Sequence, residues 1–326
     1  MLKYRAIFGP VAVIALYLIA MRWSPFEPHP PPADPSGSPT GTISWSDPDW
    51  DIFSSVLAGA DEAMLASLSM GELMAVIGRS FVGTAYVPGT LEAEGTERLI
   101  INFRGLDCVT FVETIAALSV IIKNGGAARL DDRATLETEY EQVLRALRYR
   151  NGFIDGYPSR LHYFSEWIAD NERKRLLTNI SVDLGGVLDP EPIDFMSTHP
   201  DAYRQLEDPR ALEDIEVIER RLSRQGRHYI PQEHIAEIAG EIRNGDIIAA
   251  TSTVEGLDVA HTGLALWVDD ELYLLHAPLV GEAVEISDRP LAERIQAISD
   301  QDGIIVARLH EPGAATLGDT STSRDR

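Results

Sequence analysis

The sequence predicts an α+β domain in which helices come first and an antiparallel sheet follows. Apolar residues recur at helical spacing in several segments between residues 51 and 175. After residue 245 the pattern changes to short β-rich runs separated by turn signals. Helices in one part of a chain and strands in another are typical of α+β domains.

The first 23 residues predict an export signal or a membrane anchor. A basic start precedes an uncharged apolar run from residue 6 to residue 21, as in signal sequences. The run is slightly short for a membrane span, and no A-x-A-like cleavage site precedes Arg22. An uncleaved signal-anchor and a cleaved signal peptide therefore both stay open. Residues 24–49 are rich in Pro, Ser and Gly and predict a semi-rigid linker.

Residues 50–312 are long enough for a domain with a sizeable core, and the polar residues 313–326 predict a disordered tail. The formal net charge of −23 argues against nucleic acid or anionic lipid as a partner. We therefore expect contact with a membrane only through the N-terminal segment. No C-x-x-C or H-E-x-x-H pattern is present, so we expect no metal and no cofactor.

Helices account for most of the region before residue 240. Residues 51–79 have helical apolar spacing, and Ser69 with Glu72 forms a capping-box pattern. Residues 81–89 predict a loop punctuated by Gly and Pro, and residues 99–103 a short strand. Further helices are expected after Asp107 up to Gly125, at residues 133–149, at residues 160–175 (opened by Ser159), near 212–224 and near 232–238.

The last third of the domain consists of short strands. The β-rich runs are residues 246–250, 261–268, 271–277, 283–286 and 303–309. Asp269-Asp270 separates the second run from the third and predicts a hairpin turn between them.

Cys108 is the only cysteine in the chain, so an internal disulfide is impossible. It comes where a strongly apolar helix begins, and the N–H groups and dipole of a helix start favour the nucleophilic thiolate. A buried cysteine acting as a small hydrophobe is the alternative. A free thiol in an oxidising compartment is a liability unless it has a function. The export-like N-terminus therefore favours a functional role for Cys108.

Two histidines support a catalytic role for this cysteine. His261 begins one predicted strand and His276 closes the next. In a hairpin these two positions meet at the same end of the sheet. One imidazole can then take the thiol proton while the second orients the first through its other ring nitrogen.

These residues resemble the NlpC/P60 superfamily of cell-wall cysteine hydrolases. The resemblance covers most of residues 70–310 and does not extend to residues 181–240. It rests on Gly83-Thr84-Ala85-Tyr86, Asp107-Cys108-Val109-Thr110-Phe111-Val112, His261-Thr262-Gly263 and His276-Ala277. Within the superfamily, Tyr86-Val87-Pro88-Gly89-Thr90-Leu91-Glu92 and Ser159-Arg160-Leu161-His162-Tyr163-Phe164 look like the DUF1460 branch, described as N-acetylmuramoyl-L-alanine amidase-like.

The resemblance implies a papain-like core, with the nucleophile helix packed on an antiparallel sheet and extra helices around it. It implies Cys108 as nucleophile, His261 as general base and then acid, and His276 as the orienting residue. The chain departs from the pattern at Ala85, often Pro, and at Val109, often small and polar.

Five further residues are candidates for substrate binding. Tyr86 matches a tyrosine that lies near the cysteine in this superfamily. Asp107 is equally suited to cap the helix. Arg160 and His162 follow Ser159 within one predicted helical turn and could face the cleft, where Arg160 could bind a carboxylate or a lactyl oxygen.

The resemblance implies an extracytoplasmic enzyme (periplasm or cell envelope) that cleaves the amide between N-acetylmuramic acid and L-alanine in peptidoglycan or muropeptides. A γ-D-glutamyl-diamino acid endopeptidase is the runner-up. A non-catalytic wall-binding protein and an acyltransferase with the same triad also stay open. The N-terminal anchor and linker fit each of the wall-associated functions.

Overall fold

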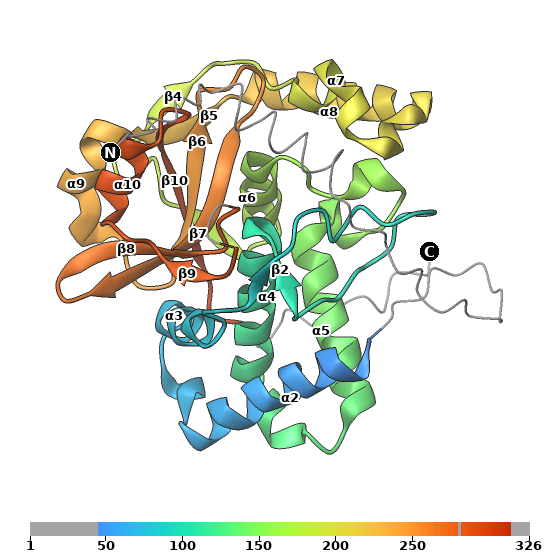
Figure 1. Ribbon diagram of the computed structural model, residues 1–326, viewed down its shortest axis with the longest axis vertical. Coiled ribbons are helices and arrows are strands. Elements are labelled where there is room, and N and C mark those ends of the chain that lie inside the picture. The colour runs from blue at the N-terminus through green and yellow to red at the C-terminus, as the bar shows by residue number, and fades with distance from the viewer. Residues whose placement is uncertain (1–44, 280–281, 314–326) are drawn as a thin grey trace, which may run out of the picture.

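Helix α4 (Cys108–Lys123) has an antiparallel sheet on one side and helices from the first half of the chain on the other (Figure 1). The computed structural model describes residues 45–279 and 282–313. The predicted signal or anchor, the linker up to residue 44 and the tail from residue 314 lie outside the described residues. Within them the architecture is α+β, as the sequence predicts.

The helices that precede residue 175 lie around α4, whereas α7 and α8 lie at the top of the view and α9 and α10 lie beside the sheet (Figure 1). Ser69 and Glu72 form the predicted capping box at the start of α3. The other helices are α2 (Asp47–Glu62), α3 (Met70–Ser80), α5 (Arg133–Arg148), α6 (Phe164–Arg173), α7 (Phe195–Thr198), α8 (Pro209–Gln225), α9 (Ile235–Ile238) and α10 (Leu291–Ala297).

The main sheet is antiparallel, in the order β4-β5-β10-β6-β7-β8-β9, and β3 also pairs with β10. Its strands are β3 (Leu177–Asn179), β4 (Val187–Asp189), β5 (Arg227–Pro231), β6 (Ile247–Ser252), β7 (Val259–Val268), β8 (Glu271–His276), β9 (Glu285–Ile286) and β10 (Gln301–Leu309). A separate parallel pair, β1 (Ala85–Tyr86) and β2 (Gly105–Leu106), leads directly into α4.

The sheet carries helices on both faces (Figure 1). On one face Leu264 of β7 belongs to the same core cluster as Phe111 of α4. On the other face Leu274 of β8 packs in a second cluster with Leu291 of α10. Successive residues of a strand point to opposite faces, so the central strands β6, β7, β8 and β10 contribute to both clusters.

A buried ion pair fixes α4 to its neighbouring helices. Arg148 Nε of α5 donates to Glu113 Oε2 at 2.7 Å, and Trp167 Nε1 of α6 donates to Glu113 Oε1 at 3.1 Å. Both charged side chains are almost completely buried. Buried charges are tolerated only when paired and hydrogen-bonded, so this contact defines how the helix that begins at Cys108 sits.

Residues 99–103 do not form the predicted strand; the short strand β2 lies just after them. Leu99, Ile101 and Phe103 of this segment are buried, but side chains bond to its backbone. Phe103 N–H donates to Asp49 at 3.0 Å, and the Ile100 carbonyl accepts from Arg148 at 2.7 Å. A side-chain partner therefore replaces a neighbouring strand.

The helix predicted at residues 160–175 begins later, at Phe164. Ser159 ends a short 3-10 turn, and Arg160 forms a β-bridge with Tyr149 that keeps its backbone extended. Strands β3, β4 and β5 were not expected, because they are short and lie in a charged, mixed segment. Tertiary pairing overrides local pattern in both cases.

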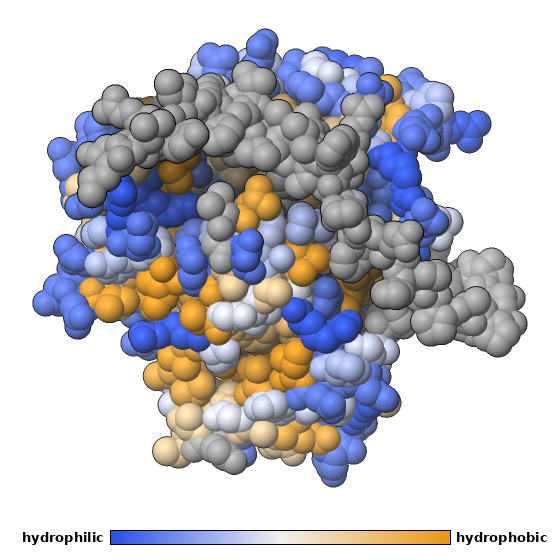
Figure 2. All heavy atoms as spheres, in the orientation of Figure 1, coloured by the Kyte–Doolittle hydropathy of each residue, from blue (hydrophilic) through white to orange (hydrophobic). Residues whose placement is uncertain are grey.

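No helix within residues 45–279 and 282–313 is long and apolar enough to cross a membrane. Figure 2 shows hydrophilic residues dominating the surface at the top of the view, where α7 and α8 lie, and hydrophobic residues gathered lower on the same face. The predicted membrane segment itself falls outside the described residues.

Candidate active site

Cys108 is the first residue of α4, and Asp107 is its N-cap. The Asp107 carboxylate accepts from the Thr110 N–H at 2.8 Å, and the Thr110 hydroxyl accepts from the Asp107 N–H at 2.9 Å. This capping box confirms the predicted cap. The first N–H groups of a helix have no intrahelical partner, so the Cys108 N–H can donate to a ligand.

Tyr86 lies beside the cysteine because the β1–β2 pair aligns it with Leu106, two residues before Cys108. Burial raises the pKa of Tyr86, and the ionisable groups of Cys108 and Asp107 raise it further. The phenol is therefore protonated at neutral pH and can donate a hydrogen bond toward the region of the sulfur.

The structure confirms the predicted hairpin between β7 and β8. Asp269 and Asp270 at its turn both have positive φ, 48° and 68°, as a type I′ turn requires. His261 and His276 meet at the opposite end of the hairpin, where His261 Nε2 lies 2.7 Å from His276 Nδ1. Strand alternation places both imidazoles on the face of the sheet that α10 covers.

Thr262 connects the cysteine to the histidine strand. Its Oγ1 donates to the Cys108 carbonyl oxygen at 2.8 Å, and its N–H and hydroxyl also interact with the sulfur. The β7–β8 ladder stops at Leu264, because β8 ends at His276. Thr262 therefore has no strand partner on the β8 side within the described residues. Cys108 therefore contacts the strand at the residue next to His261, at the end of the sheet where the histidines meet.

The thiol of Cys108 is not favoured as a thiolate in the free protein, contrary to the expectation from the helix start. Burial, followed by the adjacent Asp107 carboxylate, raises the pKa of the Cys108 thiol to about 12. Hydrogen bonds from Thr262 and from the Val109 N–H oppose this rise only in part. Cys108 is only partly exposed, and desolvation of its sulfur outweighs the helix-terminal N–H groups here.

Both histidines are neutral at physiological pH. Burial lowers the pKa of His261 well below its ordinary value, and His276 and Arg294 lower it further. Burial and then Arg294 lower the pKa of His276 to about 3. A neutral imidazole has one acceptor nitrogen, so the pair can accept a proton.

Arg294 is a cation beside these groups that no sequence pattern marks. It lies on α10, and its charge acts on both imidazoles and on Cys108. Its guanidinium contacts Gln301 Oε1 at 3.3 Å, and it forms no ion pair with any residue in the described ranges. Its short helix carries no motif, so only the packing of α10 on the sheet could reveal it.

Arg160 is engaged by the protein itself. The buried guanidinium donates to the Leu91 carbonyl at 2.9 Å and to Glu92 Oε1 at 2.6 Å, and its Nε lies 3.6 Å from Glu97. Two carboxylates therefore neutralise Arg160 and tie it to the loop that follows Tyr86.

Ser159 and His162 also make internal contacts. Ser159 Oγ donates to the Gly156 carbonyl at 2.6 Å, and His162 Nε2 lies 2.9 Å from the Tyr157 carbonyl. Because α6 begins only after His162, these residues and Arg160 do not share a helical turn as predicted. The structure does not bring them into contact with Cys108.

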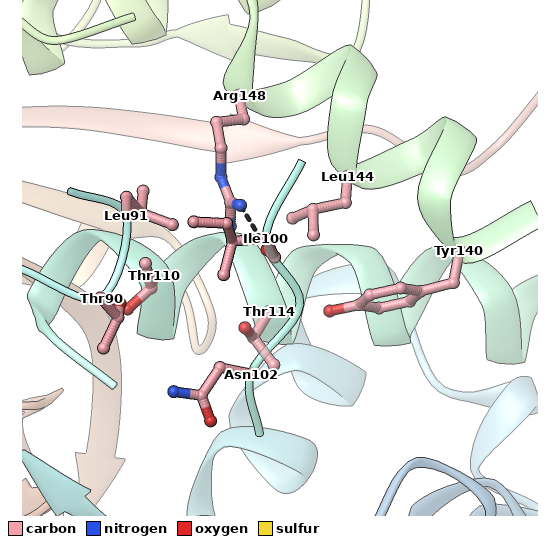
Figure 3. A pocket seen from close by; sticks show the side chains of 9 residues that line it. All are labelled: Thr90, Leu91, Ile100, Asn102, Thr110, Thr114, Tyr140, Leu144 and Arg148. Atoms are coloured by element: carbon pink, nitrogen blue, oxygen red, sulfur yellow. Dashed lines mark hydrogen bonds between the residues drawn. The ribbon is translucent and has the colours of Figure 1, made fainter. Parts of the chain in front are cut away.

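A small cavity lies beside α4, between Thr110 and Thr114 of that helix and Tyr140 and Arg148 of α5 (Figure 3). About 10 Å³ is open to the centre of a water molecule, which is room for one water. The cavity is too small for a sugar or a peptide. No group of three or more His, Cys, Asp or Glu side chains in the described part of the chain is placed to hold a metal ion.

Comparison with protein families matches residues 76–304 to a family described as AmiA-like, N-acetylmuramoyl-L-alanine amidase-like. A comparison with curated proteins finds no match.

Several solved structures are also similar to this chain. A crystal structure of an N-acetylmuramoyl-L-alanine amidase from Bacteroides uniformis is 35% identical, with a TM-score of 0.68, and covers 74% of this chain and 99% of its own. A structure from Bacteroides fragilis, described as a candidate xylanase, is 36% identical, with a TM-score of 0.66 and coverage of 71% and 99%. A Legionella pneumophila protein of family DUF1460, 21% identical with a TM-score of 0.59 and coverage of 82% and 97%, shares the fold.

Proposed function

The chain belongs to the N-acetylmuramoyl-L-alanine amidase-like family, and we propose that it is a cysteine hydrolase that cleaves the amide between N-acetylmuramic acid and L-alanine in peptidoglycan or muropeptides. Family membership supports hydrolase activity on this bond. The cysteine mechanism rests on one observation: Cys108 begins α4 and contacts β7 at the residue beside His261, which is itself bonded to His276.

We assign the site to the papain-like NlpC/P60 type. A nucleophile at the start of a helix, an antiparallel sheet against that helix and a histidine at a strand start are the parts that such a site needs. The order Cys, His, His along the chain supports the same assignment.

The reaction begins with two neutral groups. His261 uses its Nδ1 to take the proton of the Cys108 thiol as the sulfur attacks the amide carbonyl, because its Nε2 faces His276. The C–N bond then breaks, and the protonated His261 gives its proton to the leaving amine. A thioester between Cys108 Sγ and the lactyl carbonyl remains. Water attacks this thioester with His261 again as base, releasing the carboxylic acid and the free thiol.

The developing oxyanion needs preorganised donors. The Cys108 N–H at the start of α4 is one, and the protonated Tyr86 hydroxyl is the second in our proposal. Asp107 acts as the helix cap. Arg160, already neutralised by Glu92 and Glu97, shapes the loop after Tyr86, with Ser159 and His162 holding the adjoining turn.

We place the enzyme outside the cytoplasm. The support is the basic-apolar N-terminal segment followed by the Pro-rich linker, which together would hold the domain near the cell wall.

Product analysis tests this proposal. Purified protein is incubated with defined muropeptides, and the products are identified by mass spectrometry. We expect peptides with a free L-alanine amino end and release of the muramic acid carboxyl, and no release by the Cys108→Ala variant.

Three outcomes would contradict parts of the proposal. A free amine on the diamino acid would assign the bond to a γ-D-glutamyl endopeptidase. Transfer of the acyl group to an added amine in preference to water would indicate an acyltransferase. Binding without turnover by the intact protein would indicate a wall-binding scaffold.

A further inference from the structure

Each neutral imidazole carries one ring proton, on Nδ1 or on Nε2. The contact between His261 and His276 can therefore have either ring as the donor, and only one of these arrangements suits the proposed reaction. His261 Nδ1 is a base toward Cys108 only when its proton sits on Nε2. His261 Nε2–H then donates to His276 Nδ1 across the 2.7 Å contact. That in turn requires the proton of His276 to sit on its own Nε2.

His276 Nε2 lacks a hydrogen-bond partner among the described residues, although it is buried. The side chain of His276 is only 3% exposed. A buried N–H without a partner costs free energy, and nothing in the pair itself would then keep the proton on Nε2.

Glu285 faces this nitrogen. In the β8–β9 ladder Glu285 is directly opposite His276, which puts both side chains on one face of the sheet. Glu285 Oε1 lies 3.9 Å from His276 Nε2. The Glu285 side chain is 46% exposed, so rotation of this carboxylate toward the ring is not restricted by packing.

We propose that Glu285 is a positioning residue of the active site, which accepts a hydrogen bond from His276 Nε2–H and thereby sets the direction of the whole histidine relay. This inference rests on the proposed cysteine mechanism. An ionised carboxylate can only accept. It therefore fixes the proton of His276 on Nε2, the proton of His261 on Nε2, and the free electron pair of His261 Nδ1 toward the thiol.

The surroundings of His276 make the carboxylate effective. Three side chains act on His276: His261 of β7, Glu285 of β9 and Arg294 of α10. The negative charges of Asp288 and Glu285 in turn act on Arg294. Arg294 disfavours a protonated His276. Glu285 is the acceptor among these groups, so its loss removes the only described restraint on the tautomer.

Three variants test the proposal in the full-length protein. Glu285→Ala removes the acceptor, and Glu285→Gln keeps an amide oxygen that can accept. Glu271→Ala is the matched control, because Glu271 lies at the other end of β8 and its carboxylate accepts a hydrogen bond from the Tyr273 hydroxyl. Turnover of muropeptides, melting temperature and histidine ¹⁵N NMR are measured for each variant.

We expect Glu285→Ala to lower kcat by about tenfold or more, since general-base catalysis contributes about 10²–10⁴-fold, with little change in KM or melting temperature. Glu285→Gln should retain most of the activity, and Glu271→Ala should match the unmodified protein. The ¹⁵N spectrum should show His276 with its proton on Nε2, and a mixture of tautomers in Glu285→Ala.

The proposal is overturned if Glu285→Ala keeps full kcat and an unchanged His276 tautomer, or if Glu285→Gln loses as much activity as Glu285→Ala. A parallel Cys108→Ala measurement separates the two claims. Activity retained by Cys108→Ala would refute the cysteine mechanism, whereas an inactive Cys108→Ala with an unaffected Glu285→Ala refutes only the role of Glu285.

Discussion

His261 Nε2 and His276 Nδ1 are 2.7 Å apart, on two strands of one hairpin whose other end is a two-residue turn. The contact occupies the Nε2 of His261, so Nδ1 is the nitrogen that would act on Cys108 in the proposed mechanism. Because both rings are neutral and the thiol is protonated, the resting site holds no preformed ion pair. In the proposed mechanism, proton transfer therefore accompanies the attack on the substrate.

The first prediction concerns the reactivity of the thiol. Burial and Asp107 raise the pKa of Cys108, so alkylation by iodoacetamide should be slow at neutral pH and should accelerate as pH rises. Asp107→Asn removes the neighbouring charge and should lower the thiol pKa, giving faster alkylation at a fixed mildly alkaline pH.

Stability provides the control for this experiment. Asn is as good an N-cap as Asp, whereas Ala at this position costs about 1 kcal/mol. Asp107→Asn should therefore melt like the unmodified protein, and Asp107→Ala below it. A fast alkylation plateau extending to acidic pH would show a preformed thiolate–imidazolium pair and refute this description.

The second prediction concerns Arg294 and the acid limb of activity. Its positive charge lowers the pKa of both histidines. Removing the charge raises those pKa values, so His261 becomes protonated, and unable to accept a proton, at a higher pH. In Arg294→Gln the acid limb of kcat/KM should move to higher pH by about one unit.

Arg289→Gln is the matched control, because Arg289 is exposed and its pair partner is Asp288. The pH profile of this variant should stay in place. If the acid limb of Arg294→Gln is unchanged or moves to lower pH, the electrostatic link between α10 and the histidines is wrong.

The third prediction concerns the support of the nucleophile helix. Arg148→Met leaves Glu113 buried without its partner, which should cost about 3–5 kcal/mol in the free energy of unfolding. The pair between Arg129 and Glu139 lies nearer the surface, and Arg129→Met should cost about 1 kcal/mol or less. Denaturant unfolding of both variants checks the contrast, and equal losses would contradict it.

Much of the fold follows from local pattern. The capping box at Ser69, the helix cap at Asp107, the helix at residues 133–148 and the Asp269-Asp270 hairpin were all predictable, because each is encoded by neighbouring residues. The extended segment at residues 99–103 and the late start of α6 were not. Their conformations depend on distant side chains such as Asp49 and Arg148.

The candidate site also has parts that local sequence predicts and parts that depend on distant packing. The meeting of His261 and His276 follows from the hairpin and was predictable, whereas the placement of Arg294 and Glu285 depends on how α10 and β9 pack. The thiol pKa was mispredicted because a sequence shows a helix start but not the burial of the sulfur. The desolvation of the sulfur becomes visible only in the folded structure.

Trapping the acyl-enzyme tests the cysteine mechanism most directly. The protein is mixed with a muropeptide, quenched in acid and digested, and the peptide that contains Cys108 is weighed. We predict a peptide heavier by the N-acetylmuramoyl acyl group of the substrate, and no such adduct in Cys108→Ala. Hydrolysis that proceeds in Cys108→Ala, with no adduct on the intact protein at any time, would contradict it.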